Sequence, residues 1–98
     1  YDWSGYTIEV CGGAARLQDG TLAGSVITMD QAVANAVNVL GISLDSAVEM
    51  ASLTPARSVG IDDVTGSLVR GKNADITILS SKLEPVMTIV GGEMVWKD

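Results

Sequence analysis

The spacing of apolar side chains changes twice along the chain, and this limits the folds open to it. Apolar and polar residues alternate from Tyr6 to Val10, apolar residues recur at helical spacing over residues 28–60, and alternation returns after Gly66. A period of two is typical of strands and a period of 3.6 is typical of helices. The pattern predicts an extended segment, then helices, then a small antiparallel sheet.

Two helices and a short third one are expected in the middle of the chain. Thr28, with Gln31 three residues later, matches a capping box, and Gly41 ends the first helix. The second helix begins after Ser43 and stops at Pro55, which is placed to open the third helix as its first residue. The face that we expect to be buried carries Met29, Ala32, Val33, Ala36, Val37, Leu40, Leu44, Ala47, Val48 and Ala51.

Turn residues separate the expected strands. Gly12-Gly13 joins Tyr6–Val10 to a returning strand over residues 14–17, and Asp19-Gly20 is a second turn. After the helices we expect strands at 67–69, 75–79, 86–90 and 93–96. Gly91-Gly92 between the last two strands is typical of a two-residue hairpin turn.

Composition excludes several classes of partner. Twelve acidic residues against six basic ones give a net charge of −6, and Arg16 is the only base before Leu53. Binding to nucleic acid requires clustered bases, so it is not expected. No apolar run approaches the ~18 residues of a membrane span. Cys11 is the only cysteine. We expect it to be a small buried apolar residue, and it is consistent with a cytoplasmic protein.

Catalytic and metal-binding constellations are missing from the sequence. The chain has no histidine, which excludes Ser-His-Asp and Cys-His nucleophiles and zinc sites built on histidine. Residues 66–73 nearly match a phosphate-binding loop, but Asn73 replaces the hydroxyl residue and a strand follows instead of a helix. Asp62-Asp63 is expected to be a solvated loop. We therefore predict no catalytic residue and no metal ligand in this chain.

The segment Asp19–Ser25 is the candidate binding site. Its glycines allow a chain to approach a ligand closely just before a helix, so Leu22, Ala23 and Gly24 are expected to contact a small molecule through backbone N–H and C=O groups. The alternative is a connector whose glycines only relieve strain in the turns. Local pattern does not decide between the two.

Two stretches resemble a known group of enzymes. Residues 50–60 (MASLTPARSVG) and 66–76 (GSLVRGKNADI) resemble the C-terminal region of the amidohydrolase superfamily. The resemblance implies an α/β fold in two parts. Residues 1–60 would end a (β/α)8 metallo-hydrolase barrel and would include the substrate loop and terminal helices, and residues 61–98 would be strands of a small β-sandwich.

Residues 17–25 (LQDGTLAGS), leading into Thr28-Met29-Asp30, are similar to the N-acetylglucosamine-6-phosphate deacetylase family. This implies cleavage of an N-acetylated amino-sugar phosphate to glucosamine 6-phosphate and acetate. A divalent metal (zinc or similar) would activate the water and an aspartate would act as general base. In that family the metal ligands, the phosphate-binding side chains and this aspartate all lie upstream of the segment that is similar here. Only Leu22, Ala23 and Gly24 therefore match as substrate-binding residues. Family members often have serine at position 23, and they are usually homodimers.

Two other functions stay open at this stage. One is a different amidohydrolase, such as a deaminase or a dihydroorotase-like enzyme. The other is a free-standing, non-catalytic interaction domain. If the chain is part of a deacetylase, we expect the isolated segment to bind no catalytic metal, to have no deacetylase activity, and to be poorly soluble or oligomeric.

Overall fold

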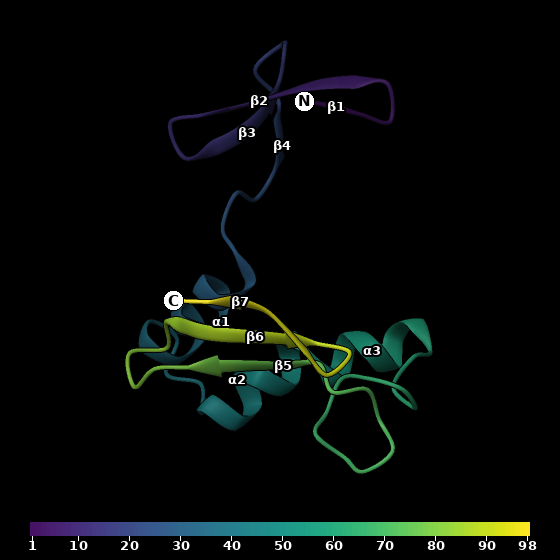
Figure 1. Cartoon of the computed structure of the whole chain (residues 1–98). Coiled ribbons are helices and arrows are strands. Elements are labelled where there is room, and N and C mark those ends of the chain that lie inside the picture. The colour runs from purple at the N-terminus through teal and green to yellow at the C-terminus, as the bar shows by residue number, and fades with distance from the viewer.

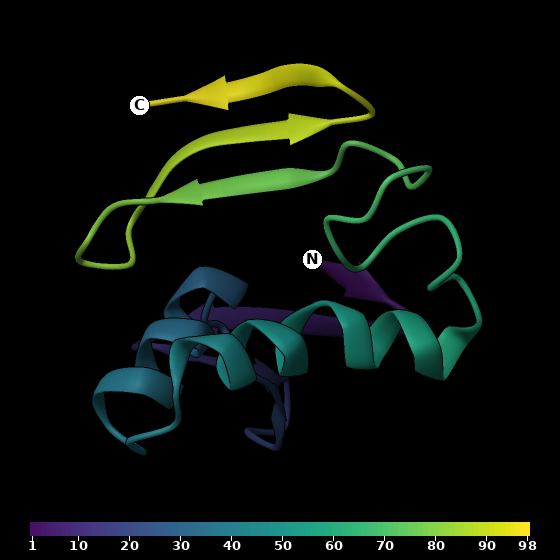
Figure 2. The ribbon, with the colours of Figure 1, turned by 90° about the horizontal axis from the view of Figure 1, so that it is seen from below.

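The computed structural model describes all 98 residues. Along the chain, three helices follow one antiparallel sheet and precede a second, and in space they lie on one side of this second sheet (Figures 1 and 2). The mixture of helices and sheets that the apolar spacing predicts is confirmed. In chain order the elements are β1 (Asp2–Trp3), β2 (Tyr6–Cys11), β3 (Ala14–Leu17), β4 (Leu22–Gly24), α1 (Met29–Asn38), α2 (Leu44–Ala51), α3 (Leu53–Val59), β5 (Ile76–Leu79), β6 (Pro85–Val90) and β7 (Glu93–Lys97).

The N-terminal sheet has the order β1-β2-β3-β4 and stands away from the rest of the molecule, linked by residues 25–28 (Figure 1). The predicted strand pair is confirmed, with Ile8 opposite Leu17 and Val10 opposite Ala15. Gly12 and Gly13 have φ of 61° and 77°, the left-handed conformation that a two-residue hairpin turn requires.

Cys11 does not lie in a core, so that expectation was wrong. It ends β2 beside the Gly12-Gly13 turn, and its side chain is exposed. A free cysteine is usually a small buried apolar residue, but no second layer of structure covers this end of the hairpin in the chain (Figure 1).

The three helices form where the sequence predicts them, with different capping at their ends. Ser43 caps α2 through its side-chain oxygen, which accepts a hydrogen bond from the Ser46 amide at 3.3 Å. Thr28 precedes α1 in an extended conformation but makes no side-chain cap. The predicted capping box is wrong, because the side-chain amide of Gln31 donates instead to Asn35 Oδ1 within the helix at 2.8 Å. The last helix starts two residues earlier than expected, so that Pro55 is its third residue.

Helix α2 packs against both α1 and α3, and each of the three helices has one buried residue that is small or branched. These are Val33, Ala47 and Ala56, with exposed fractions of 8%, 2% and 5%. Gly60 ends α3 in the left-handed conformation with φ of 78°. None of the helices is both long and apolar enough to cross a membrane.

The C-terminal sheet has the order β5-β6-β7. The hairpin at Gly91-Gly92 is confirmed, with φ of 58° and 82°. The strand expected at 67–69 is absent, and these residues belong to the loop between α3 and β5. The Lys72 amide donates to Val69 O at 3.1 Å and the Asn73 amide donates to Val64 O at 2.8 Å, so the backbone there folds into turns instead of pairing with a strand.

Asp75 connects the loop between α3 and β5 to the β6–β7 hairpin through two hydrogen bonds. Its Oδ2 accepts a hydrogen bond from Thr65 Oγ1 and its Oδ1 accepts one from the Gly91 amide, both at 2.9 Å. The Gly91 amide, and after it the Thr65 hydroxyl, hold the pKa of the Asp75 carboxyl below its ordinary value of 3.8. The carboxylate therefore connects two segments that lie 26 residues apart along the chain, from Thr65 to Gly91.

The chain buries little of its apolar surface. Five of 98 residues are buried, and all five are aliphatic. The accessible surface is 7234 Å², whereas a compact monomer of this mass exposes about 5,300 Å². The radius of gyration is 16.1 Å, against about 13 Å for a compact domain of this length. The apolar faces of both sheets and of the helices are thus left partly open.

A substitution at Gly66 tests how closely the loop after α3 packs against that helix. Its φ is +99°, and an added Cβ would lie 2.8 Å from the Ala56 side chain. Gly66→Ala should therefore destabilise the chain by about 2 kcal/mol or more, from left-handed strain and overpacking. Gly71→Ala is the matched control, because Gly71 has φ of +95° with open space around it. Equal losses of stability in urea denaturation of the two variants would show that the Ala56 contact is not tight.

The Asp75 hydrogen bonds predict a direction for acid sensitivity. Because the folded-state pKa is lowered, their stabilising effect is complete above the unfolded pKa, near 3.8, and is lost as pH falls through the lower folded value. An NMR titration should find the Asp75 carboxyl below 3.8. In Thr65→Val, which keeps the Gly91 amide, the pKa should rise while staying below the ordinary value. A wild-type pKa at or above the ordinary value would contradict the two hydrogen bonds.

Candidate functional site

Strand β4 carries the three residues that the sequence predicts to bind a ligand. Leu22, Ala23 and Gly24 form the outer strand of the N-terminal sheet, paired only with β3, and all three are exposed. An edge strand leaves backbone N–H and C=O groups unpaired on its outer side. The segment thus offers a ligand a row of backbone donors and acceptors, which is the type of contact expected from the sequence.

The turn before β4 is held by its own hydrogen bonds. The Thr21 amide donates to Asp19 Oδ1 at 2.9 Å, and Arg16 Nη1 donates to Gly20 O at 3.0 Å. Hydrogen bonding by Thr21, first through its side chain and then through its backbone amide, keeps the pKa of Asp19 below the ordinary value. These contacts fix the direction in which the chain enters β4. The predicted Asp19-Gly20 turn is confirmed, with Gly20 at φ of +89°.

Gly24 differs from Gly20 in that nothing in this chain requires a glycine there. Its φ lies outside the left-handed region, and an added Cβ would meet no atom within 4 Å. Neither backbone strain nor packing within the chain explains the missing side chain. The open space beside Gly24 is therefore available to a ligand or to another part of a larger protein.

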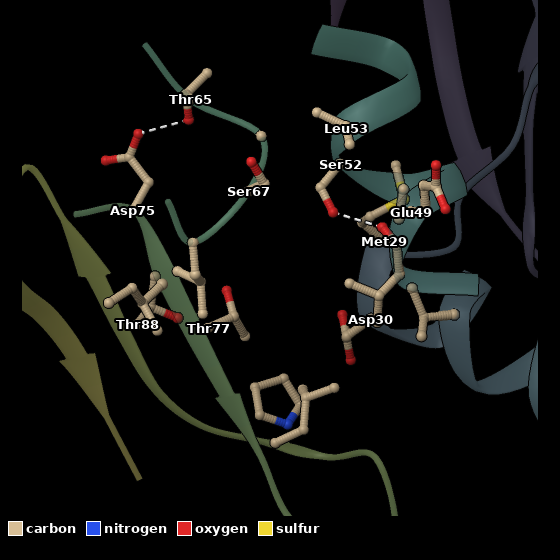
Figure 3. Close-up of a pocket in the computed structure, with 18 of the residues that line it drawn as sticks. Met29, Asp30, Glu49, Ser52, Leu53, Thr65, Ser67, Asp75, Thr77 and Thr88 are labelled. Carbon is tan, nitrogen blue, oxygen red and sulfur yellow. Dashed lines mark hydrogen bonds between the residues drawn. The ribbon is translucent and has the colours of Figure 1, made fainter. Parts of the chain in front are cut away.

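A separate cavity lies between the helices and the C-terminal sheet (Figure 3). It has a volume of about 810 Å³ and is partly open to solvent. Residues from α1, α2, β5, β6 and the loop after α3 line it. A cavity of this size is within the range of small-molecule sites. Sequence reasoning missed it, although the apolar stripe of α1 and α2 was a signal, since part of that stripe faces the cavity instead of a packed core.

The chemistry of this cavity does not suit a phosphate or a hydrolytic reaction. Its ionisable residues are Asp30, Asp45, Glu49 and Asp75, and it contains no lysine or arginine. Four carboxylates repel an anion. The Ser52 hydroxyl donates to Val48 O, and the Thr65 hydroxyl donates to Asp75 (Figure 3), whose lowered pKa makes it a weak base, so neither hydroxyl is activated as a nucleophile.

The predicted ligand-contact residues do not line this cavity. Leu22, Ala23 and Gly24 lie in the N-terminal sheet, and the cavity begins with Met29 and Asp30 at the start of α1. The structure therefore presents an exposed edge strand and a separate acidic cleft, and it does not bring them together.

The structure gathers no set of side chains that could hold a metal ion. No group of three or more histidine, cysteine, aspartate or glutamate side chains lies close enough together to hold an ion. The carboxylates that line the cleft form no such group, whereas a hydrolytic zinc site uses three protein ligands. No step of a reaction can be assigned to a metal held by these residues alone.

Comparison with known proteins gives matches along nearly the whole chain. Residues 16–95 match the model of the Amidohydrolase family. The chain is 39% identical over 94 residues to N-acetylgalactosamine-6-phosphate deacetylase of Escherichia coli O157:H7, covering 96% of this chain and 25% of the relative. It is 36% identical over 98 residues to N-acetylglucosamine-6-phosphate deacetylase of Haemophilus influenzae, covering all of this chain and 25% of that protein.

Solved structures agree with the sequence matches. The crystal structure of N-acetylglucosamine-6-phosphate deacetylase from Pasteurella multocida superposes with a TM-score of 0.86 at 35% identity, over 100% of this chain and 26% of that one. The D267A mutant of the Mycobacterium smegmatis enzyme, in complex with N-acetyl-D-glucosamine-6-phosphate, gives 0.77 at 33% identity, over 97% and 26%. The chain thus spans about a quarter of the length of these relatives. It belongs to the amidohydrolase family, and the deacetylases of N-acetylated amino-sugar phosphates are among its relatives.

Proposed function

We propose that this chain is part of a deacetylase that hydrolyses an N-acetylhexosamine 6-phosphate to the amino-sugar phosphate and acetate. The observation that carries the proposal is the similarity over essentially the entire chain, at 35% identity and a TM-score of 0.86, to an N-acetylglucosamine-6-phosphate deacetylase. Another amidohydrolase, such as a deaminase, would share the motifs at residues 50–60 and 66–76. The segment at 17–25 is what favours the deacetylase.

In this proposal the chain supplies one wall of the substrate pocket. The exposed outer side of β4 presents the backbone of Leu22, Ala23 and Gly24 to the sugar, and the absent side chain of Gly24 leaves room for it. The preceding Asp19 turn fixes the angle of this strand. Residues 1–60 would complete a metallo-hydrolase barrel, and residues 61–98 would contribute strands to a β-sandwich.

The hydrolytic chemistry would come from residues outside this chain. A divalent metal, when bound by the complete enzyme, would lower the pKa of the attacking water. The chain has no donor set for that metal and a net charge of −6, so the groups that bind the metal and the phosphate would also be located elsewhere. The role of this chain is to orient the sugar and to exclude water from one side.

The relatives named above differ in the configuration of the sugar. One is named for N-acetylgalactosamine 6-phosphate and the other for N-acetylglucosamine 6-phosphate, at 39% and 36% identity. Backbone groups on β4 could accept either epimer. We propose N-acetylglucosamine 6-phosphate as the substrate, and we take the galactosamine epimer as the second candidate.

Acetate release tests the reaction and the substrate together. The full-length enzyme carrying this chain should release acetate from N-acetylglucosamine 6-phosphate with a higher kcat/KM than from its galactosamine epimer or from unphosphorylated N-acetylglucosamine. The 98-residue chain alone should release none and should bind no equimolar zinc, because it lacks the donors. Turnover by the full-length enzyme of a cyclic amide or an exocyclic amine, without acetate release from either sugar, would overturn the proposal.

The Gly24→Val variant tests whether β4 contacts the substrate, because a lost contact lowers kcat/KM without lowering the free energy of unfolding. In the full-length enzyme this variant should lower kcat/KM on the order of 10²-fold, because a side chain displaces the sugar. It should change the free energy of unfolding by no more than about 0.5 kcal/mol, since the site is open and the backbone is not strained.

Gly20→Ala is the matched control for this experiment. With φ of +89°, it should cost about 1–2 kcal/mol of stability. Its loss of activity should follow its loss of folded protein. If Gly24→Val retains full activity, β4 is a connector and not a wall of the pocket.

A further inference from the structure

Strand β4 contains a β-bulge at the centre of the proposed substrate contact. Leu22 lies opposite Arg16, whereas Gly24 lies opposite Ala15, the neighbour of Arg16 on β3. One residue of β4, Ala23, therefore has no counterpart on β3. A bulge leaves its extra residue outside the ladder and bends the strand, and bulges are common at sheet edges and beside active sites. How Ala23 is presented to a ligand thus depends on the register between β3 and β4.

The turn before the bulge is short and is closed by backbone hydrogen bonds. The Gly20 amide donates to Leu17 O at 3.0 Å, and the Leu17 amide donates to Thr21 O at 2.8 Å. Together with the φ of +89° at Gly20, this is the geometry of a three-residue hairpin loop. Between this turn and the bulge, the only registered pair is Arg16 with Leu22. The ladder alone therefore holds the register of this segment weakly.

A second register is open to the same residues. If regular pairing continued past Gly24, Ala23 would lie opposite Arg16. Leu22 would then lie opposite Leu17, and the loop would have four residues, which is also a common hairpin length. Directly opposed residues share a face, so Leu22 would join the half-buried Leu17, whereas in the observed register it shares the face of Arg16 and is 63% exposed. Burial of apolar surface favours the second register, so a specific contact must hold the observed one.

The Arg16 side chain supplies such a contact. Its Nη1 donates to Gly20 O at 3.0 Å, while the backbone of the same residue pairs with Leu22. Arg16 therefore holds the segment from the turn to the bulge at both of its ends. Glu9 lies opposite Arg16 on β2 but forms no ion pair with it. Within this chain the guanidinium is thus committed to the turn carbonyl, a charge-assisted hydrogen bond of the stronger kind.

We propose that Arg16 is a positioning residue of the deacetylase reaction. It acts through Gly20 and holds β3 and β4 in the bulged register, in which Ala23 stands outside the ladder and faces the sugar. This role rests on the proposed function, because it concerns the strand that is proposed to contact the substrate. Arg16 itself touches neither the substrate nor the reacting groups.

Kinetics of the full-length enzyme test this role, with N-acetylglucosamine 6-phosphate and the unphosphorylated sugar as substrates. Arg16→Met keeps an apolar stem and removes the donor. It should lower kcat/KM about tenfold for both sugars, through a higher KM and a nearly unchanged kcat, because the lost hydrogen bond orients a binding wall. Arg16→Lys, which keeps a donor, should recover part of the loss. Glu9→Gln is the matched control, since Glu9 lies opposite Arg16 without an ion pair, and it should leave KM unchanged.

A crystal structure of the full-length Arg16→Met variant measures the register directly. Leu22 should lie opposite Leu17, and the bulge at Ala23 should be lost. The thermal midpoint of the variant should match that of the wild type, because the Arg16 side chain is exposed and the change is confined to one turn. A residue with only a structural role would lower the midpoint and would leave the ratio of KM to kcat unchanged.

Three results would overturn the role of Arg16. One is an Arg16→Met variant with the KM of the wild type. A second is a loss confined to the phosphorylated sugar, which would make Arg16 a direct ligand of the phosphate. The third is a variant structure that keeps the bulge at Ala23. Failure of the proposed function is distinguishable from all three, because the wild-type enzyme would then release no acetate from either sugar, while the crystal structure would still report the register.

Discussion

The incomplete burial of apolar side chains is the constraint on which the rest of this structure depends. Five buried aliphatic residues, among them Val33, Ala47 and Ala56 at the helix contacts, are all the core that the chain forms by itself. At about 25 cal/mol per Å² of apolar surface, the excess exposed area corresponds to stabilisation that only further contacts can supply. The open apolar faces of the two sheets and the cleft beside β5 are two consequences of the same deficit.

Local hydrogen bonding explains which elements could be predicted from the sequence. The Gly12-Gly13 and Gly91-Gly92 hairpins require left-handed φ values that glycine adopts freely, and Ser43 caps α2 with its own hydroxyl. The absence of the strand expected at residues 67–69 depends on distant residues. Residues 67–69 have no partner strand beside them, and the loop is held instead through Asp75, which accepts a hydrogen bond from the Gly91 amide 16 positions away.

Part of the candidate site could also be predicted from the sequence, because that part depends on local features of the chain. The exposure and backbone character of Leu22, Ala23 and Gly24 follow from a turn and a short strand, which are local features. The 810 Å³ cleft depends on how α1 and α2 meet β5 and β6, and no short motif encodes that packing. The lack of histidine excludes zinc sites built on histidine ligands, and this could be read from the sequence. What the sequence could not supply is the position of β4 relative to the groups that would perform the chemistry.

The central claim is that the outer side of β4 binds the sugar. Amide hydrogen exchange in the full-length enzyme, with and without the product glucosamine 6-phosphate, measures it directly. Binding should slow exchange at the unpaired amides of residues 22–24 while leaving the cleft segments at residues 45–53 and 65–68 unchanged. Protection confined to the cleft, with β4 exchanging at the same rate in both states, would contradict the account.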